Sequence, residues 1–148
     1  MALINGESIN LNLQGSTKEN ILKEFAALGY QVGKVSSEEG FYQGLLDRES
    51  EVTTGFGYGV AIPHAKTKYA NEVGILFGRT NNQVEWQALD DKPVNTFICF
   101  IAPEEAANEH LKLLAKISRK LMHQDFVAVL KNGTKEQILQ ALETTFES

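Results

Sequence analysis

Four segments of the chain have the hydrophobic patterns of β-strands. In residues 9–13 and 73–77, apolar side chains recur at every second position, which is typical of a half-buried strand. Residues 94–101 are nearly all apolar and β-prone, as expected for a central strand covered on both faces. A short strand is predicted at residues 60–62. It should end at Pro63, which has no N–H to donate to a neighbouring strand.

Helical spacing and capping pairs predict two helices in the first third of the chain. Ser16 and Glu19 form an S-x-x-E capping pair, and the helix that they open should end at Gly29. The same pairing recurs at Ser36, three residues before a glutamate. The second helix should run to about Arg48.

Three more helices are predicted in the last third of the chain. The first has a strong apolar stripe made of Leu111, Leu114, Ile117 and Leu121. The second should run from Gln124 to about Lys131 and end at Gly133. The third should run from Thr134 to about Thr144, with Thr134 and Gln137 as its capping pair.

The predicted order of elements is therefore β-α-α-β-β-β-α-α-α. Helices flank the cluster of strands on both sides in sequence, and a sheet between two helix layers buries both of its faces. We expect an α+β fold and a single domain over residues 1–148. The order of strands within the sheet is left open.

Composition narrows the class of protein. The 148 residues carry a formal net charge of −5, and the basic residues are scattered, which argues against nucleic acid as a partner. The single cysteine excludes an internal disulfide and fits a reducing compartment. No apolar run approaches the ~20 residues of a membrane helix, and no signal peptide is visible at the N-terminus, so a cytoplasmic location is expected.

Three residues are candidates for chemistry. His64 follows a predicted strand and a glycine-rich segment, and imidazole can become a covalent phosphoryl carrier near neutral pH. His110 falls in the middle of an apolar helix stripe, so it is either a satisfied core residue or a site residue. Arg48 lies near a helix end, where it is either a solvated charge or a planar fork that grips phosphate oxygens.

Other kinds of site are weakly supported. The glycines at 55, 57 and 59 do not form the G-x-G-x-x-G dinucleotide motif, and no Lys-Ser/Thr pair follows them as in a Walker loop. The three histidines, at 64, 110 and 123, lack the local spacing of zinc sites. A metal-dependent hydrolase built on them remains an alternative, which metal analysis of the purified protein would decide.

The motifs resemble those of one protein family. Residues 45–66, L-L-D-R-E-S-E-V-T-T-G-F-G-Y-G-V-A-I-P-H-A-K, are similar to the active-site segment of fructose/mannitol-class IIA domains of the bacterial sugar phosphotransferase system (PTS EIIA type 2). Residues 108–121, N-E-H-L-K-L-L-A-K-I-S-R-K-L, resemble the second histidine motif of the family, and the stretch around Trp86 resembles its linking segment. Ala65 departs from the glycine of many members.

The resemblance implies a fold, partners and roles. The family fold is a three-layer α/β/α sandwich around a mixed sheet. His64 is implied to be the phosphoryl acceptor, forming a tele-phosphohistidine, with His110 and Arg48 also catalytic. The donor would be the phosphocarrier HPr and the acceptor a cysteine of a IIB component, with a membrane IIC permease involved only indirectly. Neither a metal nor another cofactor is implied at this step, and neither nucleic-acid binding nor membrane insertion is expected.

Further expectations concern the surroundings of His64. The other ring nitrogen of His64 should donate to a fixed acceptor that sets the tautomer. We expect Thr54 to add a hydroxyl to phosphate binding, backbone N–H groups of residues 54–59 to assist, and Phe56 with Tyr58 to form an apolar rim. Fructose-class transport is the leading function. The alternative is a regulatory, nitrogen-class IIA-like domain that signals by its phosphorylation state.

Overall fold

The computed structural model describes residues 3–147. Within them, six strands form one sheet: β1 (Ile9–Leu13), β2 (Gly55–Gly57), β3 (Val60–Ala61), β4 (His64–Lys66), β5 (Gly74–Val84) and β6 (Val94–Ala102). The α-helices of the same region are α1 (Lys18–Gln31), α2 (Glu38–Glu51), α3 (Ala107–Lys120), α4 (Gln124–Asn132) and α5 (Lys135–Glu147). Short 3-10 turns precede β1 at Gly6–Ser8 and α3 at Glu104–Ala106.

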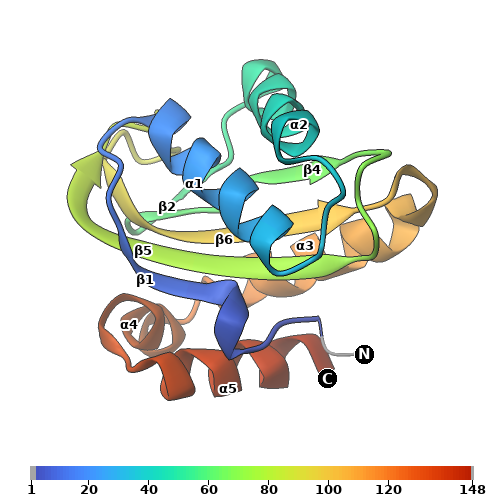
Figure 1. Cartoon of the computed structure of the whole chain (residues 1–148). Coiled ribbons are helices and arrows are strands. Elements are labelled where there is room, and N and C mark those ends of the chain that lie inside the picture. The colour runs from blue at the N-terminus through green and yellow to red at the C-terminus, as the bar shows by residue number, and fades with distance from the viewer. Residues whose placement is uncertain (1–2, 148) are drawn as a thin grey trace.

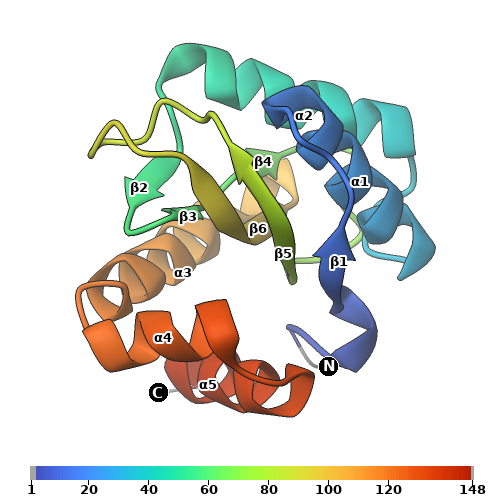
Figure 2. The ribbon, with the colours of Figure 1, turned by 90° about the vertical axis from the view of Figure 1, so that its left-hand side faces the viewer.

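The helices cover the sheet on both faces, as predicted. Helices α1 and α2 lie on one face, and α3, α4 and α5 lie on the other (Figure 1, Figure 2). Inward side chains alternate along the central strands, so that each face has its own core. The core beneath α1 and α2 includes Leu76, Phe97, Cys99 and Ile101, and the core beneath α3 to α5 includes Ile75, Phe77, Ile98 and Phe100. The fold is a three-layer α+β sandwich with a mixed sheet.

The sheet is built around the antiparallel pair β5–β6. Strand β1 runs parallel to β5 at one edge, and β3 with β4 occupies the other side of β6, both parallel to it. The predicted strand at 60–62 forms as β3, which ends at Ala61, and strand pairing is interrupted at Pro63 as predicted. Pairing resumes one residue later, and the Pro63 carbonyl accepts a hydrogen bond from the N–H of Phe100 at 3.0 Å. Proline interrupts the edge because it lacks a donor, but its carbonyl still joins the sheet.

The glycine-rich segment forms part of this edge. Sequence patterning assigned it to neither helix nor strand, whereas β2 pairs antiparallel with β3. Gly57 and Gly59 both have positive φ, at 131° and 79°, and Tyr58 between them has φ of 60°. These left-handed conformations favour glycine and make the tight turn that joins the two short strands.

The predicted boundaries of the first two helices were wrong by a few residues. The N-caps are Thr17 and Ser37, each one residue after the predicted serine. Ser36 is used elsewhere, since its hydroxyl donates to the Tyr69 carbonyl at 3.3 Å. Helix α1 continues past Gly29, and the chain reverses at Gly33, where φ is 79°.

Gly29 has a packing role inside α1. A Cβ atom at this position would lie 3.1 Å from Cε2 of Phe41, so the missing side chain lets α1 and α2 approach each other closely. Helix α2 ends at Glu51, beyond the predicted end at Arg48. Helix α5 runs three residues beyond the predicted Thr144, and the buried Phe146 near its end packs into the core.

The last two predicted caps are confirmed. Gly133 follows α4, and Thr134 and Gln137 exchange hydrogen bonds at the start of α5, at 2.9 and 3.2 Å. No helix in residues 3–147 is both long and apolar enough to cross a bilayer.

Candidate functional site

The position of Arg48 follows from the spacing of glycines on α2. Gly40, Gly44 and Arg48 are four residues apart and therefore lie on one face of the helix, toward the edge strand β4. A side chain at Gly40 would overlap the ring of Tyr69, and a Cβ at Gly44 would lie 3.3 Å from Cβ of Ala65. The two glycines bring α2 against β4 and the segment that follows it, so the third residue of the series reaches His64.

His64 is held by one hydrogen bond at each ring nitrogen. Its Nδ1 lies 2.9 Å from the carbonyl oxygen of Ile62, and its Nε2 lies 3.1 Å from Nε of Arg48. A carbonyl only accepts and the Arg48 Nε–H only donates, so the proton of the neutral ring belongs on Nδ1 and the lone pair on Nε2. The guanidinium is also anchored, because its Nη1 donates to the carbonyl of Val52 at 2.7 Å.

His110 approaches the same ring from α3. The two imidazole centroids are 5.1 Å apart, and the ring of Phe100 lies edge-on to His110 at 6.5 Å. The side chain of His110 is 2% exposed, and neither ring nitrogen has a hydrogen-bond partner among the described residues. Buried polar groups without partners are uncommon in native proteins, so these two nitrogens point to a ligand.

Both histidines are held in the neutral form at neutral pH. Burial lowers the pKa of His64 below its usual 6.5, although the Ile62 hydrogen bond opposes the shift. Burial lowers the pKa of His110 to about 4, and electrostatic interactions with His64, Lys66 and Arg48 lower it further. A neutral imidazole with a fixed tautomer has a lone pair available for nucleophilic attack.

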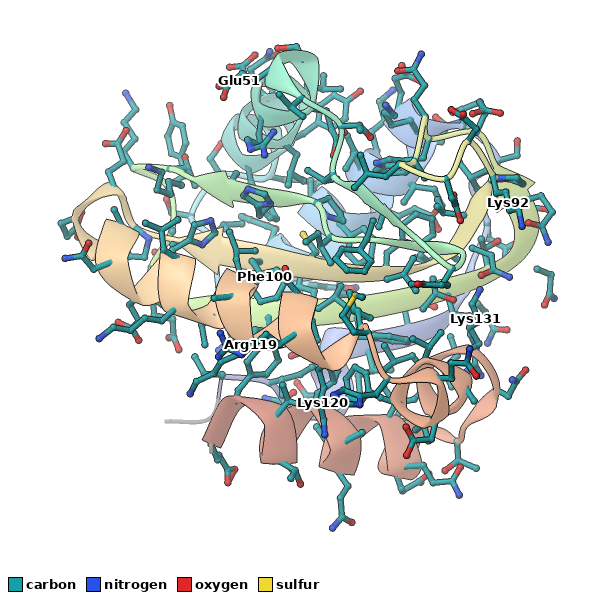
Figure 3. All side chains as sticks on the ribbon, turned by 180° about the vertical axis from the view of Figure 1, so that it is seen from behind. Glu51, Lys92, Phe100, Arg119, Lys120 and Lys131 are labelled. Atoms are coloured by element: carbon teal, nitrogen blue, oxygen red, sulfur yellow. The ribbon has the colours of Figure 1, made fainter. Side chains whose placement is uncertain are left out.

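The two histidines open into a hollow of about 620 Å³ at the edge of the sheet. Its walls are α2, β4 and α3, and Glu51 marks the α2 wall in Figure 3. The lining residues are Gly44, Asp47, Arg48, Glu51, Ile62, His64, Ala65, Lys66, His110, Leu111, Leu114 and Ser118. The structure therefore brings together three of the four predicted site residues, His64, His110 and Arg48.

The fourth predicted residue, Thr54, is engaged elsewhere and does not line this hollow. Its hydroxyl donates to the carboxylate of Glu49 and accepts from Nε1 of Trp86 at 3.3 Å. Its N–H also bonds Glu49, at 3.2 Å. The side chain of Glu49 is 4% exposed, and its carboxylate lies 3.8 Å from Nζ of Lys18. This network fixes the chain as it leaves α2 at Glu51, in the turn of helix after Arg48.

None of residues 54–59 lines the His64 hollow, so neither the expected help from their amides nor the expected rim of Phe56 and Tyr58 is found there. The amides of Gly55 and Tyr58 bond the Thr53 hydroxyl and the Asp90 carboxylate, so they are not free to bind phosphate. Tyr58 lines a separate hollow with Leu121 and Met122. The apolar rim of the His64 hollow instead comes from Ile62 and α3, where Leu111 is 62% exposed and Leu114 is partly buried.

Sequence reasoning also missed which group sets the tautomer of His64. The acceptor is the backbone carbonyl two residues earlier, and any residue type offers a carbonyl, so no sequence signal marks it. Among the described residues, no group of three or more His, Cys, Asp or Glu side chains is arranged to hold a metal ion.

Comparison with known proteins identifies the family. The family model described as "Phosphoenolpyruvate-dependent sugar phosphotransferase system, EIIA 2" matches residues 2–145. The PTS system fructose-like EIIA component of Escherichia coli K12 is 34% identical over 148 residues, covering both chains completely. A nitrogen regulatory protein of Bradyrhizobium diazoefficiens is also 34% identical, over 95% of this chain and 91% of its own.

Solved structures of IIA proteins have the same fold as this chain. The nitrogen regulatory protein IIA-Ntr of Neisseria meningitidis superposes with a TM-score of 0.87 at 27% identity, over 95% of this chain and 96% of the other. The mannitol IIA of Escherichia coli has the same fold, with a TM-score of 0.79 at 22% identity over 94% and 98%. The chain belongs to the PTS EIIA type 2 family.

Proposed function

We propose that this chain is a single-domain phosphoryl carrier of a cytoplasmic sugar phosphotransferase system. It takes a phosphoryl group from phospho-HPr on Nε2 of His64 and passes it to the cysteine of a IIB component, which serves a membrane IIC permease. The observation that carries the proposal is the hydrogen bond from Nδ1 of His64 to the Ile62 carbonyl. It leaves the lone pair on Nε2, which faces Arg48.

The first half-reaction moves the phosphoryl group between two nitrogens. The Nε2 lone pair of His64 forms a bond to phosphorus, the P–N bond of the donor breaks, and the donor imidazole leaves with the electron pair. The proton on Nδ1 stays in place, so the phosphorylated ring becomes cationic and its bond to the Ile62 carbonyl strengthens. In the second half-reaction the IIB thiolate attacks phosphorus, and the P–N electron pair returns to Nε2.

Arg48 and His110 supply the charge stabilisation. In the resting site the Arg48 Nε–H occupies the direction of the Nε2 lone pair, so the guanidinium must turn aside as the donor enters. Its remaining N–H donors then face the phosphoryl oxygens. Neutral His110 has one N–H without a partner among the described residues, and it offers a second donor. Phosphoryl transfer depends mainly on such positioning and electrostatic stabilisation.

The relatives favour a fructose-class system, with one competing role. The fructose-like EIIA component of Escherichia coli matches along its whole length. Nitrogen regulatory proteins are similarly close, since one is 34% identical and the structure of another has a TM-score of 0.87. The second candidate is therefore a regulatory domain that uses the same His64 chemistry and signals by its phosphorylation state.

A reconstitution with phosphoenolpyruvate, enzyme I and HPr tests the proposal. We expect an acid-labile phosphate on the wild type and none on His64→Ala, while His123→Ala, which alters an exposed histidine, is labelled normally. Full labelling of His64→Ala would refute the assignment. Addition of a fructose-class IIB then separates the roles, because a transport component discharges to it and a regulatory domain keeps its phosphate.

A further inference from the structure

Lys66 shares an edge of the sheet with His64. Both belong to β4, where His64 pairs with Phe100 and Lys66 pairs with Ala102 of β6. Residues two apart on a strand project to the same side, so Lys66 and His64 point the same way. Both line the same hollow.

Among the charged side chains that line the hollow, Lys66 has no ion-pair partner. Its cationic lining residues are Arg48 and Lys66, and its carboxylates are Asp47 and Glu51. Asp47 accepts a hydrogen bond from Nε2 of Gln43 at 2.9 Å. The ion pairs within residues 3–147 are Lys18–Glu49 and Lys34–Glu72, and neither involves Lys66. An exposed lysine that lines a reactive hollow without an ion-pair partner there can bind an incoming anion.

His110 provides the second observation. Its ring is buried, and both nitrogens lack a partner among the described residues. The charges of Lys66 and Arg48 are close enough to disfavour its protonated form. Two cations and a neutral ring with a free N–H surround one space, and this set matches a group with several negative oxygens.

We propose that Lys66 is a further catalytic residue, whose ammonium binds an oxygen of the phosphoryl group on its way to or from His64. The inference rests on the proposed function and adds a second cation to the hollow that Arg48 lines. Lysine acts as a point charge on a flexible stem, so it can follow the group as it moves between donor and acceptor.

Apart from Arg48, the lysines and arginines near Lys66 do not line the His64 hollow. Lys68 stacks its ammonium over the ring of Tyr69 at 5.3 Å and does not line the His64 hollow. Arg119 and Lys120 lie toward α5, away from α2, and line a different hollow (Figure 3). Lys68 is therefore the matched control for Lys66.

The test compares Lys66→Gln, Lys66→Arg and Lys68→Gln in rapid-quench transfer from phospho-HPr. We expect Lys66→Gln to be roughly tenfold slower, less than the loss of a fully buried donor, because Lys66 is solvated. Lys66→Arg should retain most of the rate, and Lys68→Gln should match the wild type. The slower transfer by Lys66→Gln should persist from about 0.05 to about 0.3 M salt. Salt screens a direct contact with the phosphoryl group less than it screens long-range attraction between the two proteins.

A spectroscopic readout separates contact from stability. In the phosphorylated protein, the Cε–Hε NMR signal of Lys66 should shift relative to the unphosphorylated state, and that of Lys68 should not. Wild-type transfer by Lys66→Gln, or a deficit that vanishes at high salt, would overturn the inference while leaving His64 as the acceptor. Failure of the wild type to be labelled at all would instead refute the proposed function, and Lys66 with it.

Discussion

Replacing His110 by leucine should stabilise the protein while slowing phosphoryl transfer. The His110 ring is 2% exposed, and neither of its nitrogens has a partner among the described residues. A buried polar group without a partner costs about 1–3 kcal/mol. Leucine removes that cost, and a change of shape at similar volume costs less than about 1.5 kcal/mol. The difference between these two amounts predicts a net gain of about 1 kcal/mol at neutral pH.

The gain should grow as the pH falls. The pKa of His110 is lowered from 6.5 to about 4 in the folded protein. Between pH 6.5 and about 4, His110 is protonated in the unfolded chain and neutral in the folded one. The free energy of unfolding of the wild type therefore falls as the pH is lowered through this interval. The full interval corresponds to about 3 kcal/mol at 1.36 kcal/mol per unit. His110→Leu lacks this loss, so its advantage over the wild type should increase between pH 6.5 and 4.

Urea unfolding of both proteins at about pH 7 and about pH 4.5 measures this difference. His123→Gln serves as the control, because His123 is exposed. Transfer from phospho-HPr to His110→Leu should slow by roughly 10²–10³, as for the loss of one oxyanion-type donor. If His110→Leu is instead less stable than the wild type, by an amount that does not change with pH, then the His110 ring has hydrogen-bond partners in the folded protein. If His110→Leu accepts the phosphoryl group at the wild-type rate, His110 serves only in packing.

Three further changes test how the site is assembled. Arg48→Lys keeps the charge but loses the planar fork that holds His64, so rapid quench should show at least a roughly tenfold slower transfer; an unchanged rate would remove Arg48 from the mechanism. Gly44→Ala places a methyl group 3.3 Å from Cβ of Ala65 and displaces α2. Transfer should fall while the urea midpoint changes little, because alanine also favours the helix by about 1 kcal/mol; normal transfer would show that α2 need not pack so closely. Chelation after HPr has been phosphorylated should leave transfer unchanged, and a loss that zinc or magnesium restores would contradict the metal-free scheme.

Periodicity predicted the fold well where local and tertiary preferences agree. The apolar run in β6 and the stripe on α3 are long enough for burial to fix both the type of element and its position. Boundaries were less accurate, because neighbouring serines and threonines offer alternative caps. Thr17 caps α1, accepting from the N–H of Asn20, although Ser16 has the better capping-box spacing.

The sequence predicted the residues of the site that belong to recognisable motifs. His64, His110 and Arg48 converge, although they come from a strand and two helices that are far apart in sequence. The part played by Thr54 depends on Glu49 and on Trp86, which lies 32 positions later in the chain. Such long-range partners decide whether a hydroxyl faces the ligand or the core, and no local pattern contains that information.

The state of the His64 ring tests the central claim most directly. Long-range ¹H–¹⁵N spectra of the imidazole rings, recorded before and after phosphorylation by phospho-HPr, report which nitrogen carries the proton and which carries phosphorus. We predict a proton on Nδ1 in both states, consistent with its bond to the Ile62 carbonyl, and phosphorus on Nε2 of His64. Phosphorus on Nδ1, or on a ring other than His64, would contradict the account.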